Sequence, residues 1–280
     1  MMAARMRRLR PVLRDIGFNL ISLLLVSFFA LPVFYVVSGA FMSRAEVYAG
    51  ALLPARLQLE NLRIALVEYK MTRYFLNSLL FTTSIVGLNL LFCSLTGYAL
   101  AKFEFPGKRV LFTLVLVSMM IPSLVLIVPL FIEVSYLGWL NKPIAVIAPA
   151  FLDPFGVFLM RQYIVDISDE HLDAARVEGC SEFGIFWKIV IPFSMPALFA
   201  LTLYRFMYVW NDLFWPLLVL GGERWRPLSV AVQQFGARYF AAQELQLTTS
   251  FVAALPMLLI LVFTSRHVFN AISRTGGLKI

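Results

Sequence analysis

Long apolar runs constrain this chain more than any other feature of its sequence. Six of them are long enough to cross a membrane, at about residues 16–40, 74–99, 109–132, 143–161, 193–220 and 249–270, since about 20 residues rising about 1.5 Å each span the hydrocarbon core. Composition agrees, because 60% of the residues are hydrophobic and the mean hydropathy is +0.82. The sequence therefore predicts an all-α integral membrane protein with six transmembrane helices.

The first apolar run follows the basic segment RMRRLRPVLRD. A signal peptide also begins with a basic segment, but its apolar core is about 7–15 residues long. The run from Ile16 to Ala40 is 25 residues, and no clear A-x-A site follows it. We therefore expect an uncleaved first helix after a cytoplasmic N-terminus, residues 1–15.

The distribution of basic residues predicts the orientation. With a cytoplasmic N-terminus and six spans, 14 of the 24 lysines and arginines fall on the cytoplasmic side, nine fall outside and Arg205 lies within a span. Cytoplasmic loops carry the excess of Lys and Arg. We expect both ends inside, with a cytoplasmic tail at residues 271–280.

Prolines inside the expected spans include those at positions 122, 129, 149, 154, 216 and 256. Such prolines are tolerated where neighbouring groups satisfy the freed backbone, and they often mark kinks. We interpret them as features of helix packing within otherwise continuous spans.

A charged stretch, HLDAARVEGCSEFGIFWKIVIP at residues 171–192, separates two of these apolar runs. Ser168 is a suitable N-cap for a helix through DEHLDAARVE, which would end at Gly179. Ser181 can cap a second helix, in which Phe183, Phe186, Trp187 and Val190 form one apolar stripe and which Pro192 would end. The pattern predicts helix, glycine turn and helix within a cytoplasmic loop at residues 162–192.

Such a pair of helices could bind either the lipid surface or another protein. An amphipathic helix can rest on lipid. The first helix, however, is net acidic, whereas the inner leaflet is anionic and attracts basic segments. Its acidic surface and its small residues Ala174 and Ala175 favour docking in a protein groove.

The stretch resembles the "EAA" loop of permease subunits of ATP-binding-cassette (ABC) importers, whose pattern is roughly E-A-A-x-x-D-G, about nine residues, then I-x-L-P. Here the chain reads DAARVEG at 173–179 and IVIP at 189–192, with Asp for Glu, Glu for Asp and Ile191 for Leu. ALAKFEFPGKR at 99–109, FLMRQYI at 158–164, WNDLFWPLLVL at 210–220 and the closing GGLKI are similar to the carbohydrate-uptake branch, in particular the smaller permease of maltose-type systems.

The resemblance implies a type I ABC importer permease that moves a sugar or sugar-like solute inward by alternating access. The loop would be a coupling helix docked on an ATPase subunit through Asp173, Ala174, Ala175, Glu178 and Gly179. The implied partners are a second permease, a cytoplasmic ATPase dimer and an extracytoplasmic binding protein. In that family the loop corresponding to residues 221–248 helps eject substrate from the binding protein, although a passive surface loop is the alternative here.

This chain carries no visible nucleotide site. KFEFPGKR contains Gly-Lys but lacks the first glycine and the Ser/Thr of a phosphate-binding loop. The resemblance implies that partner subunits bind ATP and Mg²⁺. Neither His171 nor His267 has a sequence partner for catalysis, and Cys93 and Cys180 show no metal-site spacing. A membrane enzyme, a channel and a secondary transporter are therefore less favoured than an ABC permease.

Polar residues inside the spans are candidates for the substrate path: Asn77, Asp153, Arg205, Trp210, Asn211 and Asp212. Asn and Asp inside a span are costly, so we expect the last two to face the permease interior. Asp153 and Arg205 lie about 16 and 20 Å into their spans, at similar depth. Either these two charges are neutralised by each other or by the second permease, or Arg205 reads an anionic group such as a phosphate or sulfonate. The solute is thus a sugar, a polyol or an anionic sugar-like molecule.

Overall fold

The computed structural model describes the backbone of residues 2–239 and 241–275, and the side chains of 17–239 and 241–260. Within these residues every regular element is a helix, so the predicted all-α class is confirmed. The chain divides into two compact units, Met1–Met71 with Val232–Ile280, and Thr72–Ala231. The GGLKI terminus and the His267 side chain, noted in the sequence, lie outside the described part.

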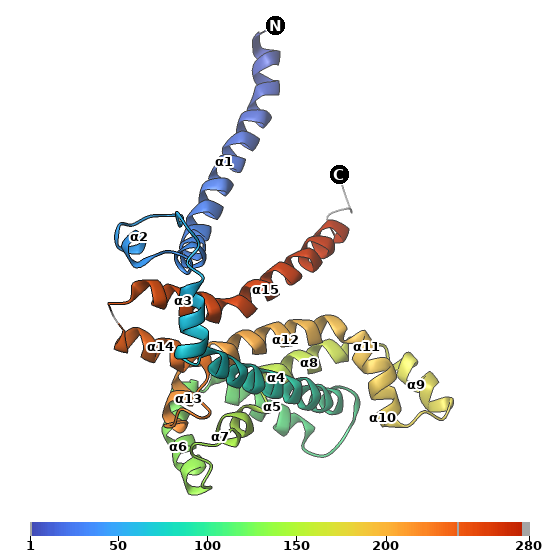
Figure 1. The fold of residues 1–280 in the computed structure, drawn as a ribbon. Helices are drawn as coiled ribbons and strands as arrows, with labels where there is room; N and C mark the ends of the chain where they lie inside the picture. Colours follow the sequence, from blue (N-terminus) through green and yellow to red (C-terminus); the bar gives the residue numbers. More distant parts are fainter. Residues whose placement is uncertain (1, 240, 276–280) are drawn as a thin grey trace. The chain divides into compact units, whose positions relative to one another are not determined.

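The described residues form eighteen helical elements, and Figure 1 shows how they follow one another. They are α1 (Met2–Gly39), α2 (Arg44–Tyr48), α3 (Glu60–Arg63), the π-helix η1 (Ile64–Glu68), α4 (Met71–Lys102), α5 (Lys108–Met120), α6 (Ser123–Tyr136), α7 (Ile144–Ile147), the 3₁₀ turn η2 (Ala148–Ala150), α8 (Pro154–Val165), α9 (Asp169–Val177), α10 (Glu182–Ile185), the π-helix η3 (Phe186–Val190), α11 (Ile191–Phe193), α12 (Met195–Trp210), α13 (Phe214–Val219), α14 (Leu228–Arg238) and α15 (Gln243–Thr275).

Four segments of the described chain are long and apolar enough to cross a membrane: Gly17–Gly39, Met71–Lys102, Ile144–Val165 and Gln243–Ile260. Two further pairs qualify only together, α5 with α6 and the Glu182–Phe193 segment with α12, and these pairs are bent by 104° and 77°. Counting each bent pair as one span gives six, which agrees with the six spans expected from the sequence.

The expected continuous helix over 109–132 is instead two helices. The break falls at Ile121, which is extended with φ −83° and ψ 119°. Proline clashes with a helical residue before it, so Pro122 explains the conformation of Ile121 and the end of α5. Pro129, by contrast, lies inside α6.

Another proline divides the span expected at 143–161. Asp153 precedes Pro154 and is extended, with φ −106° and ψ 122°. Its carboxylate accepts a hydrogen bond of 2.8 Å from the Gly156 N–H and caps α8. The span therefore consists of α7, η2, a short break and α8, and α8 continues to Val165, beyond the expected end.

The span expected at 193–220 also ends earlier than the sequence suggested. α12 stops at Trp210, and the short α13 follows after three residues. Pro216 has no N–H to donate to the carbonyl of Asp212. That carbonyl instead accepts a hydrogen bond of 2.7 Å from the Ser229 hydroxyl.

In the unit formed by the two ends of the chain, α1 packs on α15. A side chain on Gly39 would meet the Leu247 side chain at 2.6 Å, so a larger residue would have to displace that side chain. The Thr248 hydroxyl, fully buried, donates to the carbonyl of Ala40 at 3.1 Å. These contacts fix the end of the first span against the last.

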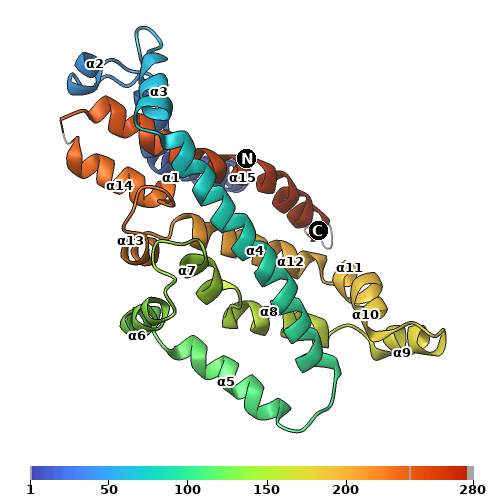
Figure 2. The same ribbon diagram turned by 60° about the horizontal axis from the view of Figure 1, so that its bottom comes forward.

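The unit Thr72–Ala231 has two apolar clusters. One, containing Phe81, Ile85, Val146 and Val219, lies among α4, α7 and α13. The other joins α4, α8 and α12 to the loop helices α9 and α10 with η3, and its fully buried members include Leu172 and Phe186. In Figure 2, α9 to α11 lie together at one end of this unit, beyond the end of α8. The charged loop is thus part of the packed structure.

Candidate functional site

The charged loop folds as the sequence predicts. The Ser168 hydroxyl accepts from the Glu170 N–H and begins α9, and the Ser181 hydroxyl accepts from the Gly184 N–H and begins α10. Gly179 between them has φ +83° and open space around its Cα. Such a positive φ is cheap only for glycine, so the predicted helix, glycine turn and helix are confirmed.

The second helix does not end at Pro192, as the sequence suggested. A π-turn, η3, continues from α10, and Pro192 lies inside the following turn, α11. The chain then bends at Ser194, where α12 begins. Residues from Glu182 to Phe193 form one helical segment, so Pro192 lies inside it and the bend falls two residues later.

The loop helices present an acidic outer surface. Asp173, Ala174 and Glu178 are exposed, whereas Ala175 is 7% exposed and packs inward with Leu172. Of the two alanines expected to face a partner, only Ala174 is exposed, because the two lie about 100° apart around a helix. Val177, which the sequence analysis did not single out, is 89% exposed.

The apolar stripe of the second helix is divided between inside and outside. Phe186 and Val190 are fully buried, but Phe183 is 62% and Trp187 47% exposed. An exposed phenylalanine and tryptophan beside the acidic surface leave apolar area available to a partner.

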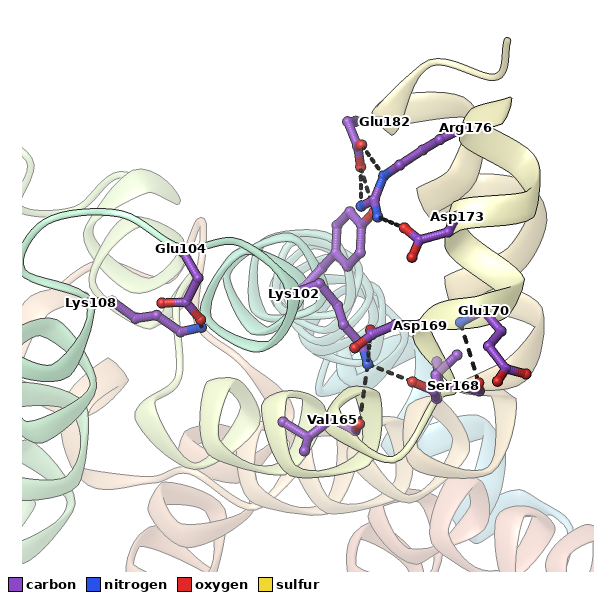
Figure 3. A network of polar contacts seen from close by, with 12 residues as sticks. Lys102, Glu104, Lys108, Val165, Ser168, Asp169, Glu170, Asp173, Arg176 and Glu182 are labelled. Atoms are coloured by element: carbon purple, nitrogen blue, oxygen red, sulfur yellow. Dashed lines mark hydrogen bonds and ion pairs between the residues drawn. The ribbon is translucent and has the colours of Figure 1, made fainter. Parts of the chain in front are cut away.

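A chain of polar contacts connects the loop to the end of α4 (Figure 3). The Tyr98 hydroxyl donates to Oε2 of Glu182 at 2.8 Å. Oε1 of Glu182 accepts from Nε of Arg176 at 2.7 Å, and Nη1 of Arg176 donates to Oδ1 of Asp173 at the same distance. The contacts run from a buried tyrosine in a long span to the exposed face of α9.

Lys102 makes a second connection, at the last residue of α4. Its side chain is 6% exposed, and its Nζ donates to Oδ1 of Asp169 at 2.8 Å and to the carbonyl of Val165 at 3.2 Å. It also donates to the carbonyl of Ile167. A lysine at the end of a helix satisfies free carbonyls there, so Lys102 ties the end of α8 and the start of α9 to α4.

The two connections change the acidity of the loop side chains. Lys102 holds the pKa of the Asp169 carboxyl below its usual range. The hydrogen bond from Lys102 is the larger cause, and its positive charge is the smaller one. Hydrogen bonds to Glu182 and then to Asp173 raise the pKa of Arg176. Each group is therefore held in its charged form at neutral pH.

Sequence analysis missed Tyr98, Lys102, Arg176 and Glu182 as members of this site. The two α4 residues lie 84 and 67 positions from Glu182 and Asp169. Their sequence signal is the motif ALAKFEFPGKR at 99–109, which contains Lys102 and directly follows Tyr98.

The structure brings Asp153 and Arg205 together inside the same unit. Nη1 of Arg205 lies 3.2 Å from Oδ1 of Asp153, and Nη2 donates to the carbonyl of Ala150 at 3.2 Å. The two side chains are 5% and 13% exposed. Of the two explanations for these charges, the geometry supports the one in which Arg205 and Asp153 neutralise each other.

The other candidates for the substrate path do not form one cluster. Asn77 donates from its amide to the carbonyls of Arg224 at 3.1 Å and Arg226 at 2.8 Å, so it holds the loop before α14. Trp210 is 4% exposed and stacks on Phe206. Asn211 is exposed, and its amide donates to a carbonyl of its own helix.

Asp212 shares a small cavity with Arg205. The cavity has a volume of about 40 Å³, and its lining includes Ser78, Thr82 and Trp215. Nε of Arg205 and the Thr82 hydroxyl are buried there without a hydrogen-bond partner among the described residues. A water needs roughly 10–15 Å³, so the cavity can hold a few waters but no sugar ring in this conformation.

Comparison with known proteins shows sequence similarity along almost the whole chain. It is 33% identical, over 98% of its length and 99% of the other's, to the arabinooligosaccharides transport system permease protein AraQ of Halalkalibacterium halodurans. It is 26% identical to the lactose transport system permease protein LacG of Rhizobium radiobacter, over 95% of this chain and 96% of that one.

A solved structure shows the same fold. It is a chain from a bacterial ABC transporter involved in the import of the acidic polysaccharide alginate, with a TM-score of 0.77 and 24% identity over 90% of this chain and 97% of that one. Residues 93–274 match the family described as "Binding-protein-dependent transport system inner membrane component". The chain belongs to this family: it is a membrane permease component of an ABC importer and not an enzyme.

Proposed function

We propose that this permease carries a sugar or oligosaccharide into the cytoplasm by alternating access. The observation that carries this proposal is the 33% identity, along almost the entire chain, to a permease for arabinooligosaccharides. An anionic solute is less favoured, because the buried Arg205 that suggested one already has Asp153 as its counter-charge. A thermal-shift screen of neutral oligosaccharides, polyols and sugar phosphates on the cognate binding protein tests the class of solute.

The remaining subunits supply what this chain lacks. The proposed assembly contains a second, different permease, an ATPase dimer that binds ATP and Mg²⁺, and an extracytoplasmic binding protein. A tagged form of this chain should co-purify with one other permease and with an ATPase. Purification of a functional transporter from this chain alone would overturn the assembly.

The loop at α9 and α10 is proposed as the coupling site. Closure of the ATPase dimer would carry the docked helices with it, and a rigid connection would pass that motion to the spans. Asp173, Ala174, Glu178 and the exposed Val177 lie on the accessible side, and the contacts of Tyr98 and Lys102 supply the rigid connection to α4.

Substitutions in the loop test this role. Gly179→Asp and Asp173→Lys should abolish uptake while the protein still reaches the membrane. Gly50→Asp is the matched control, because Gly50 also has a positive φ, +70°, and open surroundings, but lies outside the loop. Normal uptake in both loop variants would overturn the coupling role, whereas equal loss in the control would identify a general folding defect.

The water-sized cavity beside Arg205 and Asp212 is proposed as a closed part of the substrate path. A cysteine at Asp212 should react with a water-soluble maleimide, and saturating ATP or the transported sugar should change the rate. Reaction with a lipid-soluble reagent alone would place Asp212 on the lipid face and overturn this assignment.

Both ends of the chain are proposed to be cytoplasmic, on the charge bias of the loops. Single cysteines at two exposed positions test this in a background without Cys93 and Cys180. Arg56→Cys, before α3, should react with an impermeant maleimide on intact spheroplasts. Glu104→Cys, between α4 and α5, should react only after the membrane is opened, and the reverse result would invert the topology.

A further inference from the structure

A basic cavity lies at the turn between α4 and α5. It has a volume of about 520 Å³ and is lined by Lys108, Arg109 and Arg161, together with Glu104 and several apolar residues. The turn joins the end of one apolar helix to the start of another, so the cavity lies at a membrane–water boundary.

Most of the positive charge in this cavity is unneutralised. Lys108 pairs with Glu104 at 2.8 Å, but the carboxylate is 90% exposed and screened by water. Arg161 places its guanidinium 4.0 Å from the centre of the Phe112 ring and forms no ion pair with any described residue; the same is true of Arg109. Two arginines are therefore free to bind an anion.

The start of α5 adds to this positive potential. Its first turn contains Lys108 and Arg109 and no acidic residue, and its N-cap, Gly107, offers no side chain to the free N–H groups. Cations at the positive end of a helix are unfavourable unless an anion is present. The Lys108 N–H donates to the carbonyl of Phe105, and the other free N–H groups of this turn lie beside basic side chains with no capping side chain.

An apolar groove adjoins the basic cavity. It has a volume of about 430 Å³ and is lined by α4 residues from Leu95 to Leu100 and by Leu111 and Val115 of α5. Phe105 lines both spaces. Lys108 and Leu111 are three residues apart and so lie on neighbouring faces of the helix. A charged space and an apolar space are thus adjacent at Phe105.

We propose that this composite site binds an anionic phospholipid. Arg109 and Arg161 hold the phosphate, for which the planar guanidinium fork is suited, and one acyl chain lies in the groove between α4 and α5. The groove favours a lipid over free phosphate, because an inorganic ion would leave it unfilled. Basic pockets between transmembrane helices are suited to such headgroups.

Native mass spectrometry of the complete detergent-purified transporter tests the site, with phosphatidylglycerol as the probe. Arg109→Gln and Arg161→Gln should each weaken binding about fivefold, since one basic residue near a lipid surface contributes about that factor. Glu104→Gln, which removes the competing carboxylate, should bind equally well or more tightly. Arg56→Gln removes an exposed charge elsewhere and should leave binding unchanged.

Two further arms separate the possible sources of the phosphate. Ala99→Trp fills the groove and should weaken phosphatidylglycerol binding, and phosphatidylcholine should bind more weakly than phosphatidylglycerol throughout. Melting temperatures of all variants in neutral detergent show whether a loss reflects unfolding, and Arg109, which is exposed, provides a variant that should fold normally. Unchanged binding in Arg109→Gln, or displacement by millimolar inorganic phosphate without any effect of Ala99→Trp, would overturn the lipid site.

Discussion

The guanidinium of Arg205 in α12 and the carboxylate of Asp153 before α8 are 3.2 Å apart and almost completely buried. The same carboxylate caps α8 by accepting from the Gly156 N–H. One acidic side chain therefore starts a helix in the middle of a span and neutralises a cation on the neighbouring span. Loss of either partner would leave an unpaired, almost completely buried charge.

The pair makes a double-mutant prediction. Arg205→Gln alone should destabilise the assembled transporter by about 3–5 kcal/mol, the cost of leaving one buried charge unpaired. Arg205→Gln/Asp153→Asn should recover much of that loss, because asparagine still caps a helix. Thermal unfolding and uptake measure both effects. If the double variant is as unstable as the single one, the charges do not depend on each other.

The hydroxyl of Tyr98 provides a sharper test of coupling. Tyr98→Phe keeps the buried ring, which packs near Phe103 and Phe186, but removes the hydrogen bond to Glu182. We expect ATP hydrolysis to continue while the solute imported per ATP falls several-fold, because the loop is less rigidly held to α4. Reconstituted proteoliposomes measure both rates.

Tyr163→Phe is the matched control for this test. Tyr163 lies in α8, is 37% exposed and makes no hydrogen bond through its hydroxyl within the described residues. Its substitution should leave the ratio of transport to hydrolysis unchanged. Equal ratios in the two variants would show that the Tyr98 contact does not transmit motion.

The local structure of the loop could be predicted because its signals are local. Two serine caps and a glycine with positive φ fix where α9 begins and ends and where α10 begins, and each of these can be recognised within three or four residues. The contacts that secure the loop could not be predicted in this way. Tyr98 and Lys102 meet residues 84 and 67 positions away, and this proximity depends on how α4 packs on α8.

For the spans, too, some features could be predicted from the sequence and others could not. Hydropathy located all six apolar segments, but it is insensitive to a proline that breaks one of them. Pro122 and Pro154 each force an extended residue before them, and the sequence analysis interpreted both as kinks in continuous helices. The rule for residues preceding proline would have placed these breaks. The pairing of Asp153 with Arg205 was one of two alternatives, and only their relative position decided between them.

The Lys102–Asp169 contact predicts a pH dependence. Because the pKa of Asp169 is lowered on folding, the stabilisation is present above the ordinary Asp range and is lost as pH falls through the lowered value. Asp169 is charged at both pH 6 and pH 8. Lys102→Met should therefore increase the rate of amide hydrogen exchange at the start of α9, relative to wild type, by the same factor at both pH values. Lys142→Met, which removes a lysine that contacts Gly138 instead, is the control. A difference between wild type and Lys102→Met that disappears at pH 8 would contradict this origin.

Gly97 lies where α4 packs tightly on α8. A Cβ at this position would lie 2.8 Å from the Met160 Cβ and 2.9 Å from the backbone nitrogen of Arg161. Small residues let membrane helices approach in this way. Gly97→Ala should lower stability by about 1–3 kcal/mol, the usual cost of overpacking, and Gly97→Val should lower it further.

Gly87 in the same helix supplies the comparison, because a Cβ there would meet nothing within 4 Å. Gly87→Ala should leave the melting temperature of the detergent-purified transporter unchanged or raise it slightly, since alanine is about 1 kcal/mol more favourable than glycine inside a helix. The contrast therefore separates helix propensity, which acts at both positions, from the close contact at Gly97. A melting temperature that changes by the same amount in Gly97→Ala and Gly87→Ala would show that α4 and α8 do not approach as closely in the assembled transporter.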